Sequence, residues 1–508
     1  MVSDDLLTAT RPHHPPRTSL AELGDWLSGR GGAPALVGDG SVAVQGISLS
    51  SQRILPGDLY AALPGSRTHG VSFVDQALTA GAVAVLTDDE GAAALAGRAP
   101  ALVVSRPRAV LGALSARVYD EPATRLRMVG VTGTQGKTTT TRLADEALLA
   151  SGTRSAVVGT VGTRINGAEV KTALTTPEAP DLHGLFARMV EDGVEACAME
   201  VSSHALVMGR VDGVVFDVAV FTNLGRDHLD FHATLEDYYL AKASLFTPER
   251  ARLALVSVDD EHGRRLAGET AVPVRTFSVR GTDADWRAVD LELSPAGSRF
   301  TVVAPDGTSY PTSVSLPGDF NVANGLAAVA AAAEAGCDPA AVAAGLARTG
   351  GVAGRLERVE GGQDFTVIVD YAHKPDALAA AVATLRPLTQ GRLVVVLGAG
   401  GDRDAGKRPI MGEVVAAVAD LLVVTDDNPR SEDPAAIREA VLAGASGGRA
   451  EVLEIGDRRL AIREALRRAR SGDVVLIAGK GHETGQEVAG VVHPFDDRTV
   501  AAEELGRR

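Results

Sequence analysis

One short passage constrains the fold of this chain more than any other. An apolar run, RMVGVTG at 127–133, leads directly into TQGKTTTTRLADEALLA at 134–150, which has helical character after Gly136. Glycines in such a loop let backbone N–H groups converge on phosphate oxygens, and the helix N-terminus adds positive potential. Lys137 can supply a point charge, and Thr138 can bind Mg²⁺. The passage therefore predicts an α/β domain with a nucleoside-triphosphate site.

The passage matches a narrow form of the usual G-x-x-x-x-G-K-[ST] pattern. That pattern requires glycine at position 131, where this chain has Val131. An ordinary glycine turn is the alternative, but the preceding strand, the following helix and the Lys-Thr pair favour ATP binding. The expected ATP contacts in this loop are Gly133, Thr134, Gln135, Gly136, Lys137, Thr138 and Thr139.

Length and composition limit the class of protein. At about 150 residues per domain, the 508 residues predict about three domains. A net charge of −15 disfavours binding to nucleic acid or to anionic membranes. The two cysteines, Cys197 and Cys337, exclude a disulfide scaffold. The N-terminus has no apolar signal region, so we expect a cytoplasmic monomer with a loose leader before Ser19.

Apolar runs alternate with helix-like stretches along most of the chain, which predicts an α/β fold with mostly parallel sheets. We expect a small α/β domain over 19–123, with the charged, proline-containing stretch 120–127 as its linker. A central domain follows over 124–352, and within it the pattern over 290–316 predicts an antiparallel ribbon. A third, Rossmann-like domain is expected over 353–508.

Several passages, in order along the chain, resemble the Mur ligase and folylpolyglutamate synthetase superfamily of ATP-dependent amide-forming ligases. The resemblance extends from about Gly46 to the C-terminus, and it implies that the three predicted domains bind a UDP-linked precursor, ATP and an amino acid. The passages are GTQGKT (133–138), TTPEA (175–179), MEVSSHAL (199–206), FTNLGRDHLDFH (221–232), YYLAKASLF (238–246), GDFNVANGLAA (318–328), GRLE (354–357) and DYAHKPDAL (370–378).

The resemblance assigns a metal to two strand ends. Glu200 ends the run CAMEV and His228 follows VAVFTN, at positions where parallel sheets present ligands. Taken alone, Glu200 would be a solvated carboxylate and His228 a loop histidine. The resemblance implies that both bind Mg²⁺ together with Thr138, and that they act in catalysis with Lys137.

Lys242 has two interpretations. Helical spacing puts Tyr238 and Phe246 on its face, and from the sequence alone we favour a lysine that snorkels from a half-buried helix. The resemblance implies instead a catalytic lysine that carbon dioxide converts to N6-carboxylysine. The carbamate would remove a cation and provide an oxygen ligand for Mg²⁺.

The resemblance also implies contacts to ATP and to the precursor. As bare residues, Asn324 would be an ordinary polar group at a helix start, Arg355 a linker charge and Thr175 a turn residue. A guanidinium delivered from the hinge would stabilise developing phosphate charge, so we expect domain closure before chemistry. The implied ATP contacts are Asn324, Arg355, Asp370 and His373, and the implied precursor contacts are Ser51, His69, Gly70, Thr175, Thr176, Ser202 and Arg210.

One motif bears on the choice of amino acid. Asp427-Asn428-Pro429-Arg430 follows the strand-like run LLVVTD, where a turn is the plain alternative. A guanidinium can bind a carboxylate through two hydrogen bonds, and diaminopimelate has a second carboxylate that lysine lacks. In the resembling ligases this pattern accompanies diaminopimelate. The implied contacts are Arg403, Asp427, Asn428, Pro429, Arg430, Gly479 and Glu483.

The resemblance implies ligation of diaminopimelate to the D-glutamyl γ-carboxylate of UDP-N-acetylmuramoyl-L-alanyl-D-glutamate, through an acyl phosphate, in peptidoglycan synthesis. Three alternatives stay open: a lysine-adding muramoyl ligase, a folylpolyglutamate synthetase-like ligase, and a nucleotide-switched binding protein without ligase activity. More than 100 residues precede Gly133, which argues against the second. The D-N-P-R and GKGHE motifs together argue against the first. The passage Ser50-Ser51-Gln52 departs from the Asp-Ser-Arg of many relatives, so the uridine contacts are less defined.

Overall fold

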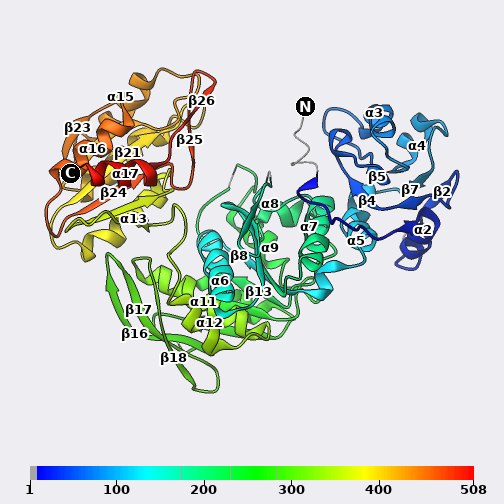
Figure 1. Cartoon of the computed structure of the whole chain (residues 1–508), viewed down its shortest axis with the longest axis horizontal. Helices are drawn as coiled ribbons and strands as arrows, with labels where there is room; N and C mark the ends of the chain where they lie inside the picture. The colour runs from blue at the N-terminus through cyan, green and yellow to red at the C-terminus, as the bar shows by residue number, and fades with distance from the viewer. Residues whose placement is uncertain (1–7, 32, 173, 229, 282, 508) are drawn as a thin grey trace. The chain divides into compact units, whose positions relative to one another are not determined.

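The structure is a computed structural model that describes residues 8–31, 33–172, 174–228, 230–281 and 283–507 (Figure 1). It confirms the expected α/β class, with mostly parallel sheets. The domain boundaries expected at 123/124 and 352/353 stay predictions. Contacts divide the chain into two compact units: Met1–Arg287, Ala304–Thr308 and Leu326–Gly345 form the first, and Ala288–Val303, Ser309–Gly325 and Leu346–Arg508 form the second.

The first unit begins with a five-stranded sheet in the order β2-β7-β6-β5-β4, in which only β2 is antiparallel. Apolar side chains pack α2 and α5 on one face of this sheet and α3 and α4 on the other. The bounds are β1 (Thr18–Ser19), α2 (Leu20–Ser28), β2 (Ala35–Val37), β3 (Ala43–Val44), β4 (Gly46–Ser48), β5 (Asp58–Ala61), α3 (Val74–Thr79), β6 (Ala84–Thr87), α4 (Asp89–Leu95), β7 (Ala101–Val103) and α5 (Pro107–Val118).

The prediction of a loose leader before Ser19 is wrong for the described residues 8–18. The Arg11 guanidinium is buried and forms an ion pair with Asp58, with 2.9 Å between Nη2 and Oδ2. Thr10 Oγ1 donates a hydrogen bond of 3.0 Å to Asp181. A buried charge needs a partner, and these partners lie too far along the chain for sequence spacing to indicate them. The segment is therefore an ordered arm that contacts both the first sheet, through Asp58, and the helix over Ala179–Glu191, through Asp181.

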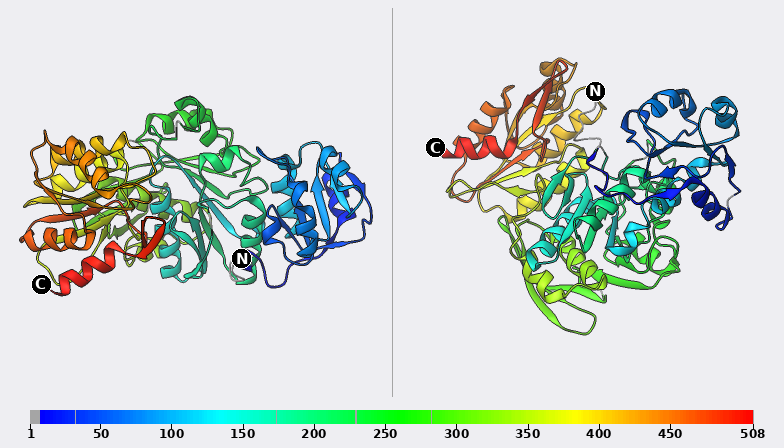
Figure 2. Two further views of the ribbon diagram at one scale, coloured as in Figure 1. Left: turned by 90° about the horizontal axis from the view of Figure 1, so that it is seen from above. Right: turned by 45° about the vertical axis from the view of Figure 1, so that its right-hand side comes forward.

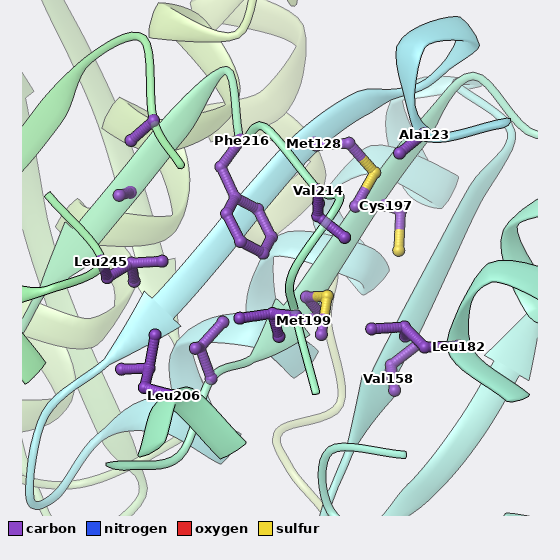
Figure 3. Close-up of a cluster of buried hydrophobic side chains, with 14 of the residues drawn as sticks. Ala123, Met128, Val158, Leu182, Cys197, Met199, Leu206, Val214, Phe216 and Leu245 are labelled. Atoms are coloured by element: carbon purple, nitrogen blue, oxygen red, sulfur yellow. The ribbon is translucent and has the colours of Figure 1, made fainter. Parts of the chain in front are cut away.

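The central sheet of the first unit has the strand order β11-β10-β9-β12-β8-β13-β14-β15. The six strands from β9 to β15 in this order are parallel, and β10 and β11 form an antiparallel hairpin that was not predicted. Figure 3 shows one face of its core, where Met128, Met199 and Phe216 pack together. The strands are β8 (Arg127–Thr132), β9 (Ser155–Gly159), β10 (Gly162–Ile165), β11 (Ala168–Val170), β12 (Ala196–Glu200), β13 (Val218–Phe221), β14 (Ala254–Ser257) and β15 (Val274–Ser278).

This strand order positions the predicted site. β12 and β13 flank β8, so Glu200 lies beside Val131 and Phe221 lies beside Thr132. The carboxyl ends of the three strands therefore open on the same edge of the sheet. The helices around them are α6 (Lys137–Ser151), α7 (Ala179–Glu191), α8 (Ser203–Val207), α9 (Leu235–Ala243) and α10 (Glu261–Glu269); α11 (Asp319–Glu334) and α12 (Pro339–Leu346) follow later in the chain.

The second unit contains a six-stranded sheet in the order β19-β20-β24-β21-β22-β23. Helices α13, α14 and α15 pack on one face and α16 and α17 on the other, and Figure 2 shows the red helix α17 away from the yellow helices. The bounds are β19 (Glu357–Arg358), β20 (Thr366–Asp370), α13 (Pro375–Leu388), β21 (Leu393–Ala399), α14 (Lys407–Val418), β22 (Leu421–Asp426), α15 (Pro434–Ala445), β23 (Glu451–Glu454), α16 (Arg458–Arg468), β24 (Val474–Ala478) and α17 (Asp497–Gly506).

Two antiparallel features complete the structure. The ribbon predicted over 290–316 is confirmed, with β16 (Trp286–Ser294), β17 (Gly297–Val303) and β18 (Ser309–Val314). A second hairpin, β25 (Gly485–Val488) and β26 (Val491–Pro494), was not predicted. The linker expected at 120–127 contains a short 3-10 helix over Pro122–Arg125 whose first two residues are buried. This linker is therefore packed against the fold and is not an extended tether.

Candidate active site

The glycine loop after β8 has a backbone that only glycine adopts without strain. Gly133 has a φ of 149° and Gly136 a φ of 88°. A Cβ atom at Gly133 would overlap Thr222 Oγ1 at the end of β13. Gly136 caps α6, which begins at Lys137. The predicted strand, loop and helix are all confirmed, and the loop lies at the carboxyl edge of the central sheet.

Hydrogen bonds fasten this loop to the segment that follows β13. The Thr134 N–H donates to the Asn223 carbonyl at 2.9 Å, and the Gln135 N–H donates to Asn223 Oδ1 at 3.0 Å. The Thr222 hydroxyl donates to the Gln135 carbonyl at 2.6 Å. The loop is therefore held in shape by a neighbouring strand end.

Two lysines converge on one carbonyl oxygen of the loop. Lys137 Nζ donates to the Gly133 carbonyl at 2.8 Å and to the Thr134 carbonyl at 3.0 Å. Lys242 Nζ, from α9, donates to the same Gly133 carbonyl at 2.7 Å. Thr138 and Thr139 are buried in the first turn of α6. The loop therefore places two ammonium groups at the position where phosphate is expected.

Lys242 does not snorkel to solvent, so the interpretation that spacing favoured is wrong. The residue is 1% exposed, and its Nζ lies 4.4 Å from the centre of the Tyr238 ring. Burial, together with the charge of Lys137, holds the pKa of the Lys242 ammonium well below its usual range. Burial also raises the pKa of Tyr238 to about 12. An amine in this environment loses its proton more readily than an ordinary lysine.

Glu200 is buried at 1% exposure, so the alternative of a solvated carboxylate is wrong. Its Oε1 accepts the Thr160 N–H at 2.7 Å, and its Oε2 accepts the Thr160 hydroxyl at 3.2 Å. The Glu200 carbonyl accepts the Thr176 hydroxyl at 2.8 Å. These contacts fix the carboxylate beside the loop that carries Thr175 and Thr176.

His228 lies in a group of aromatic rings. Its backbone has a φ of 54°, and its Nε2 lies 3.6 Å from Asp227 Oδ2. Its ring meets that of His204 edge-on, with centroids 5.0 Å apart. The His204 ring stacks on Phe231 at 3.9 Å between centroids. Sequence reasoning missed His204 and Phe231 as neighbours of His228, although both lie within the motifs that carried the resemblance.

A cavity of about 350 Å³ brings many of the predicted residues together. Of the sequence-predicted residues, it collects members of the phosphate loop, the metal set and the precursor set. Five further lining residues were not predicted: Thr160, Leu174, Ser203, His204 and Tyr238. The lining residues are Lys137, Thr160, Leu174, Thr175, Thr176, Ser202, Ser203, His204, Arg210, His228, Tyr238 and Lys242.

The precursor residues in this cavity are held by local hydrogen bonds. Arg210 Nε donates to Glu178 Oε1 at 2.8 Å. The hydroxyls of Thr175 and Thr160 lie 3.2 Å apart. The Ser202 hydroxyl caps α8 by accepting the Ala205 N–H at 3.2 Å. The cavity wall is therefore lined by hydroxyl groups and one guanidinium, which suits a polar anionic ligand.

The other three predicted precursor contacts line neither this cavity nor the next. Ser51 Oγ donates to Gln76 at 2.9 Å, and His69 Nε2 lies 3.1 Å from Asp88 Oδ1. Gly70 packs against the backbone of Leu63. A second cavity of about 370 Å³ lies beside Ser51, and sequence reasoning missed its lining: Thr10, Ser48, Leu49, Ser50, Arg53, Lys171, Thr172, Leu174, Pro177, Glu178, Pro180 and Asp181.

In the second unit, three of the expected ATP contacts gather near the end of β20. Asp370 accepts the N–H groups of Leu356 and Ala372, each at 2.8 Å. Burial raises the pKa of the Asp370 carboxyl, and the charge of Arg355 opposes that shift. Burial lowers the pKa of His373, whose Nδ1 lies 2.9 Å from the Tyr371 carbonyl. Arg355, Asp370 and His373 therefore lie together at the carboxyl end of β20.

Asn324 lies inside α11 and is not the helix-start residue of the plain alternative. It is 6% exposed, and its Nδ2 donates to Asn321 Oδ1 at 3.1 Å. Asn321 in turn donates to the Pro317 carbonyl at 2.8 Å. A buried amide in an otherwise alanine-rich helix requires such partners. The pair therefore fixes the orientation of Asn324.

The residues expected to contact diaminopimelate surround the carboxyl ends of β22 and β24. Arg430 has a φ of 53°, and its Nη1 donates to the Gly401 carbonyl at 2.6 Å. Asn428 Nδ2 donates to Glu483 Oε2 at 2.9 Å. Arg403 is exposed. Pro429 is buried, Asp427 is buried beside Gly479, and all seven residues lie within the second unit.

Family models match three stretches of the chain. They are described as "Mur ligase family, catalytic domain" over residues 43–119, "Mur ligase middle domain" over 131–332, and "Mur ligase, glutamate ligase domain" over 354–481. The UDP-N-acetylmuramoyl-L-alanyl-D-glutamate--2,6-diaminopimelate ligase of Streptomyces coelicolor is 54% identical, over 97% of this chain and 98% of that protein. The chain belongs to the Mur ligase family.

Further comparisons agree with this family. A Corynebacterium glutamicum Mur ligase of the same name is 51% identical, over 90% of this chain and 91% of that protein. A solved structure described by that name superposes with a TM-score of 0.71 at 34% identity, covering 96% and 99% of the two chains. A Mycobacterium tuberculosis folylpolyglutamate synthase structure is 19% identical over 73% of this chain, with a TM-score of 0.57, and that likeness shows the fold alone.

The residues at the glycine loop fit a Mur ligase site for ATP and Mg²⁺. A Cβ atom would fill the cradle at Gly133, and Thr138 and Glu200 offer the hard oxygen donors that Mg²⁺ prefers. Within the described ranges, no three histidine, cysteine, aspartate or glutamate side chains form a metal site by themselves. A Mg²⁺ site here would combine the Thr138 hydroxyl and the Glu200 carboxylate with phosphate oxygens of the bound nucleotide. In the same described part of the chain, no helix has the length and apolar character to cross a bilayer.

We predict that Gly133→Ala weakens binding of a non-hydrolysable ATP analogue by on the order of a hundredfold, because the new Cβ must displace Thr222 and the loop with it. Gly152→Ala is the matched control. Gly152 closes the other end of α6 with a φ of 92°, and nothing lies within 4 Å of the added Cβ. The control should cost about 1 kcal/mol of stability and leave affinity unchanged. Calorimetric titration measures the affinity of each variant, and thermal unfolding measures its stability. Wild-type affinity in Gly133→Ala would contradict the assignment.

Proposed function

We propose that this chain is a Mur ligase that joins diaminopimelate to the D-glutamyl γ-carboxylate of UDP-N-acetylmuramoyl-L-alanyl-D-glutamate, with ATP as the energy source. The observation that carries the proposal is the cavity that unites Lys137, Lys242 and His228 with the hydroxyls of Thr175 and Thr176. The names of its relatives, which are diaminopimelate ligases, support the identity of the substrates. We assign the reaction to the cytoplasmic stage of peptidoglycan synthesis.

The phosphate end of the site would hold ATP through the loop and α6. Backbone N–H groups at the start of α6 and the Lys137 ammonium offer donors to the phosphate oxygens. Bound Mg²⁺ would neutralise charge on the phosphates, held by Thr138, Glu200 and His228. Asn324, Arg355, Asp370 and His373 are the proposed further contacts to the nucleotide.

We propose that Lys242 carries a carbamate in the active enzyme. Carbon dioxide reacts with a neutral amine, and the lowered pKa of Lys242 favours that form. Carbamylation would replace one of two neighbouring ammonium groups by an anion, which removes their repulsion. The Gly133 carbonyl would keep Lys137 as its donor. The site would then hold one cation and one additional oxygen ligand beside the phosphates.

The precursor would lie along the wall of hydroxyls in the same cavity. Arg210 is fixed by Glu178, and its Nη1 also donates to the Thr176 carbonyl at 3.4 Å. Thr175, Thr176 and Ser202 offer donors to the carboxylate-bearing peptide portion. We propose that Ser51, His69 and Gly70, in the first sheet's domain, contact the uridine end. The boundaries proposed for the three domains remain 19–123, 124–352 and 353–508.

The amino acid would bind at the carboxyl ends of β22 and β24. Arg430 would bind the second carboxylate of diaminopimelate through its planar guanidinium, and Arg403 would add a second cation. The Glu483 carboxylate would accept hydrogen bonds from the distal ammonium group of diaminopimelate. Lysine offers no carboxylate at that end, so Arg430 would have no anionic group of the amino acid to bind. The proposed contacts also include Asp427, Asn428, Pro429 and Gly479.

The reaction would proceed in two displacements. A γ-carboxylate oxygen of the precursor attacks the γ-phosphorus of ATP, the bond to the bridging oxygen breaks, and ADP leaves. The neutral amine of diaminopimelate then attacks the resulting acyl carbon and loses a proton. The tetrahedral intermediate collapses, and the carbon–oxygen bond to phosphate breaks. Lys137 would stabilise charge in the first step, and positioning of the reactants would supply much of the rate.

The direct test offers purified protein the precursor and ATP with meso-diaminopimelate, LL-diaminopimelate or L-lysine in parallel. We expect a UDP-linked tripeptide only with a diaminopimelate isomer, measured by mass spectrometry of the product. Incorporation of lysine alone would contradict the proposed specificity. Phosphate release that ignores both precursor and amino acid would support the binding-protein alternative instead.

The same assay applied to Arg430→Ala tests the carboxylate contact. The KM for diaminopimelate should rise on the order of a hundredfold, because a charged partner of the second carboxylate is lost, while the KM for ATP stays unchanged. Arg449→Ala is the control, since Arg449 is an exposed arginine that pairs with Asp420 beyond the other end of β22. An unchanged KM in Arg430→Ala would remove this residue from the pocket.

The carbamate has its own test. Lys242→Arg keeps the positive charge but cannot form a stable carbamate, so we expect ligation to fall by at least about a hundredfold. In ¹³C-bicarbonate, the wild-type protein should show a carbamate carbon signal that Lys242→Arg lacks. Lys374→Arg, at an exposed lysine, should keep both the signal and the activity. Full activity in Lys242→Arg would rule out the carbamate.

A further inference from the structure

The motif GKGHE contains a lysine to which the proposed function gives no role. Lys480 follows Gly479 at the end of β24 and is 0% exposed. Its Nζ lies 3.1 Å from Asn428 Oδ1, 3.4 Å from Asp427 Oδ1 and 3.4 Å from Glu483 Oε2. A buried ammonium is costly unless it is paired and hydrogen-bonded. All three of its partners belong to the proposed diaminopimelate contacts.

Lys480 reaches these partners across a whole strand. In the sheet, β21 lies between β24 and β22, which carries Asp427 and Asn428 at its carboxyl end. Gly398 in β21 makes room for this arrangement, because a Cβ atom there would lie 2.9 Å from Asp427 Cβ. The ammonium therefore joins two strand ends that are not neighbours. Few side chains other than lysine combine this reach with a charge.

The ammonium also fixes the orientation of the Asn428 amide. Lysine only donates hydrogen bonds, so the amide must turn its oxygen toward Nζ. The Glu487 N–H, from β25, donates to the same Oδ1 at 2.9 Å. The amide nitrogen is then directed at Glu483 Oε2, at 2.9 Å. Lys480 thus sets the position of Glu483 both directly and through Asn428.

The charges around Lys480 also require a cation at this position. The side chains of Asp427 and Glu483 are 7% and 35% exposed, and Lys480 is the cation that contacts both. The neighbouring Arg458 is fully buried but bound to Asp497 through two hydrogen bonds of 2.7 Å. Without Lys480, no cation among the described residues would contact both the buried Asp427 carboxylate and the partly exposed Glu483 carboxylate, and the two would repel one another.

We propose that Lys480 is a positioning residue that holds Asp427, Asn428 and Glu483 together as one rigid wall of the amino acid pocket. The inference rests on the proposed function for the identity of that amino acid. Lys480 itself is covered by its partners and would not touch the substrate. Its effect should therefore appear in the binding of the amino acid and not in the use of ATP or of the precursor.

The test compares Lys480→Met with wild-type protein, using KM and kcat for each of the three substrates. We expect the KM for diaminopimelate to rise at least about tenfold, with a smaller fall in kcat and with the other two KM values within about twofold. Lys480→Arg keeps the charge and should recover part of the loss. An unchanged KM for diaminopimelate, or an equal rise in all three KM values, would overturn the inference.

Arg392→Met is the matched structural control. Arg392 forms an ion pair of 3.0 Å with the buried Asp473. Both residues lie at the amino ends of their strands, β21 and β24, and Lys480 lies at the carboxyl end of β24. This variant should lower the melting temperature and leave the KM for diaminopimelate unchanged. If Arg392→Met raises that KM as much as Lys480→Met does, the effect is loss of stability, and the positioning role is wrong.

If Lys480→Met does not fold, the double variant Asp427→Asn/Lys480→Met removes the charge pair together and is compared with Asp427→Asn alone. A higher KM for diaminopimelate in the double variant supports positioning of Asn428 and Glu483. Equal values would show that Lys480 only neutralises Asp427, which overturns the inference. Absence of diaminopimelate ligation in the wild-type protein would instead refute the proposed function, so the two failures are distinguishable.

Discussion

Two ammonium groups donate hydrogen bonds to one backbone carbonyl oxygen in the glycine loop after β8, and the proposed site is built around this contact. Lys137 and Lys242 both donate to Gly133, although the residues are 105 positions apart in the sequence (242 minus 137). Two cations at this separation repel one another in a buried site, and the lowered pKa of Lys242 reflects this together with burial. A nearby anion, or the loss of one proton, would relieve this repulsion. The proposed phosphate and the proposed carbamate would each place negative charge beside the glycine loop.

Both sheets use the same device for positioning functional groups. In the central sheet, β12 and β13 flank β8, so Glu200 and Thr222 stand beside the glycine loop. In the second unit, β24 and β22 flank β21, and Lys480 joins their ends. Parallel strands present their following loops on one edge, which gathers residues from distant parts of the sequence. Each unit thereby gathers its own proposed contact residues at one edge of its sheet.

The sequence predicts the local features of this site well. Strand, glycine loop and helix at 127–150 follow from short-range pattern, and so do the strands that end at Glu200 and Asp426. Contacts between residues far apart in the sequence were not predicted in the same way. The burial of Lys242 depends on a carbonyl 109 positions away, and spacing along α9 alone indicated a snorkelling lysine. Arg11 was likewise assigned to a loose leader because nothing near it in the chain shows its partner Asp58.

The central claim is that a carboxylate oxygen of the precursor attacks the terminal phosphorus of ATP. The most direct measurement uses precursor labelled with ¹⁸O in the D-glutamyl γ-carboxylate and determines the mass of the phosphate released during ligation. The account predicts that each phosphate carries one oxygen from that carboxylate, because the carbon–oxygen bond breaks when the amine attacks. Phosphate without the label would mean that water attacks the phosphorus, and it would contradict the account.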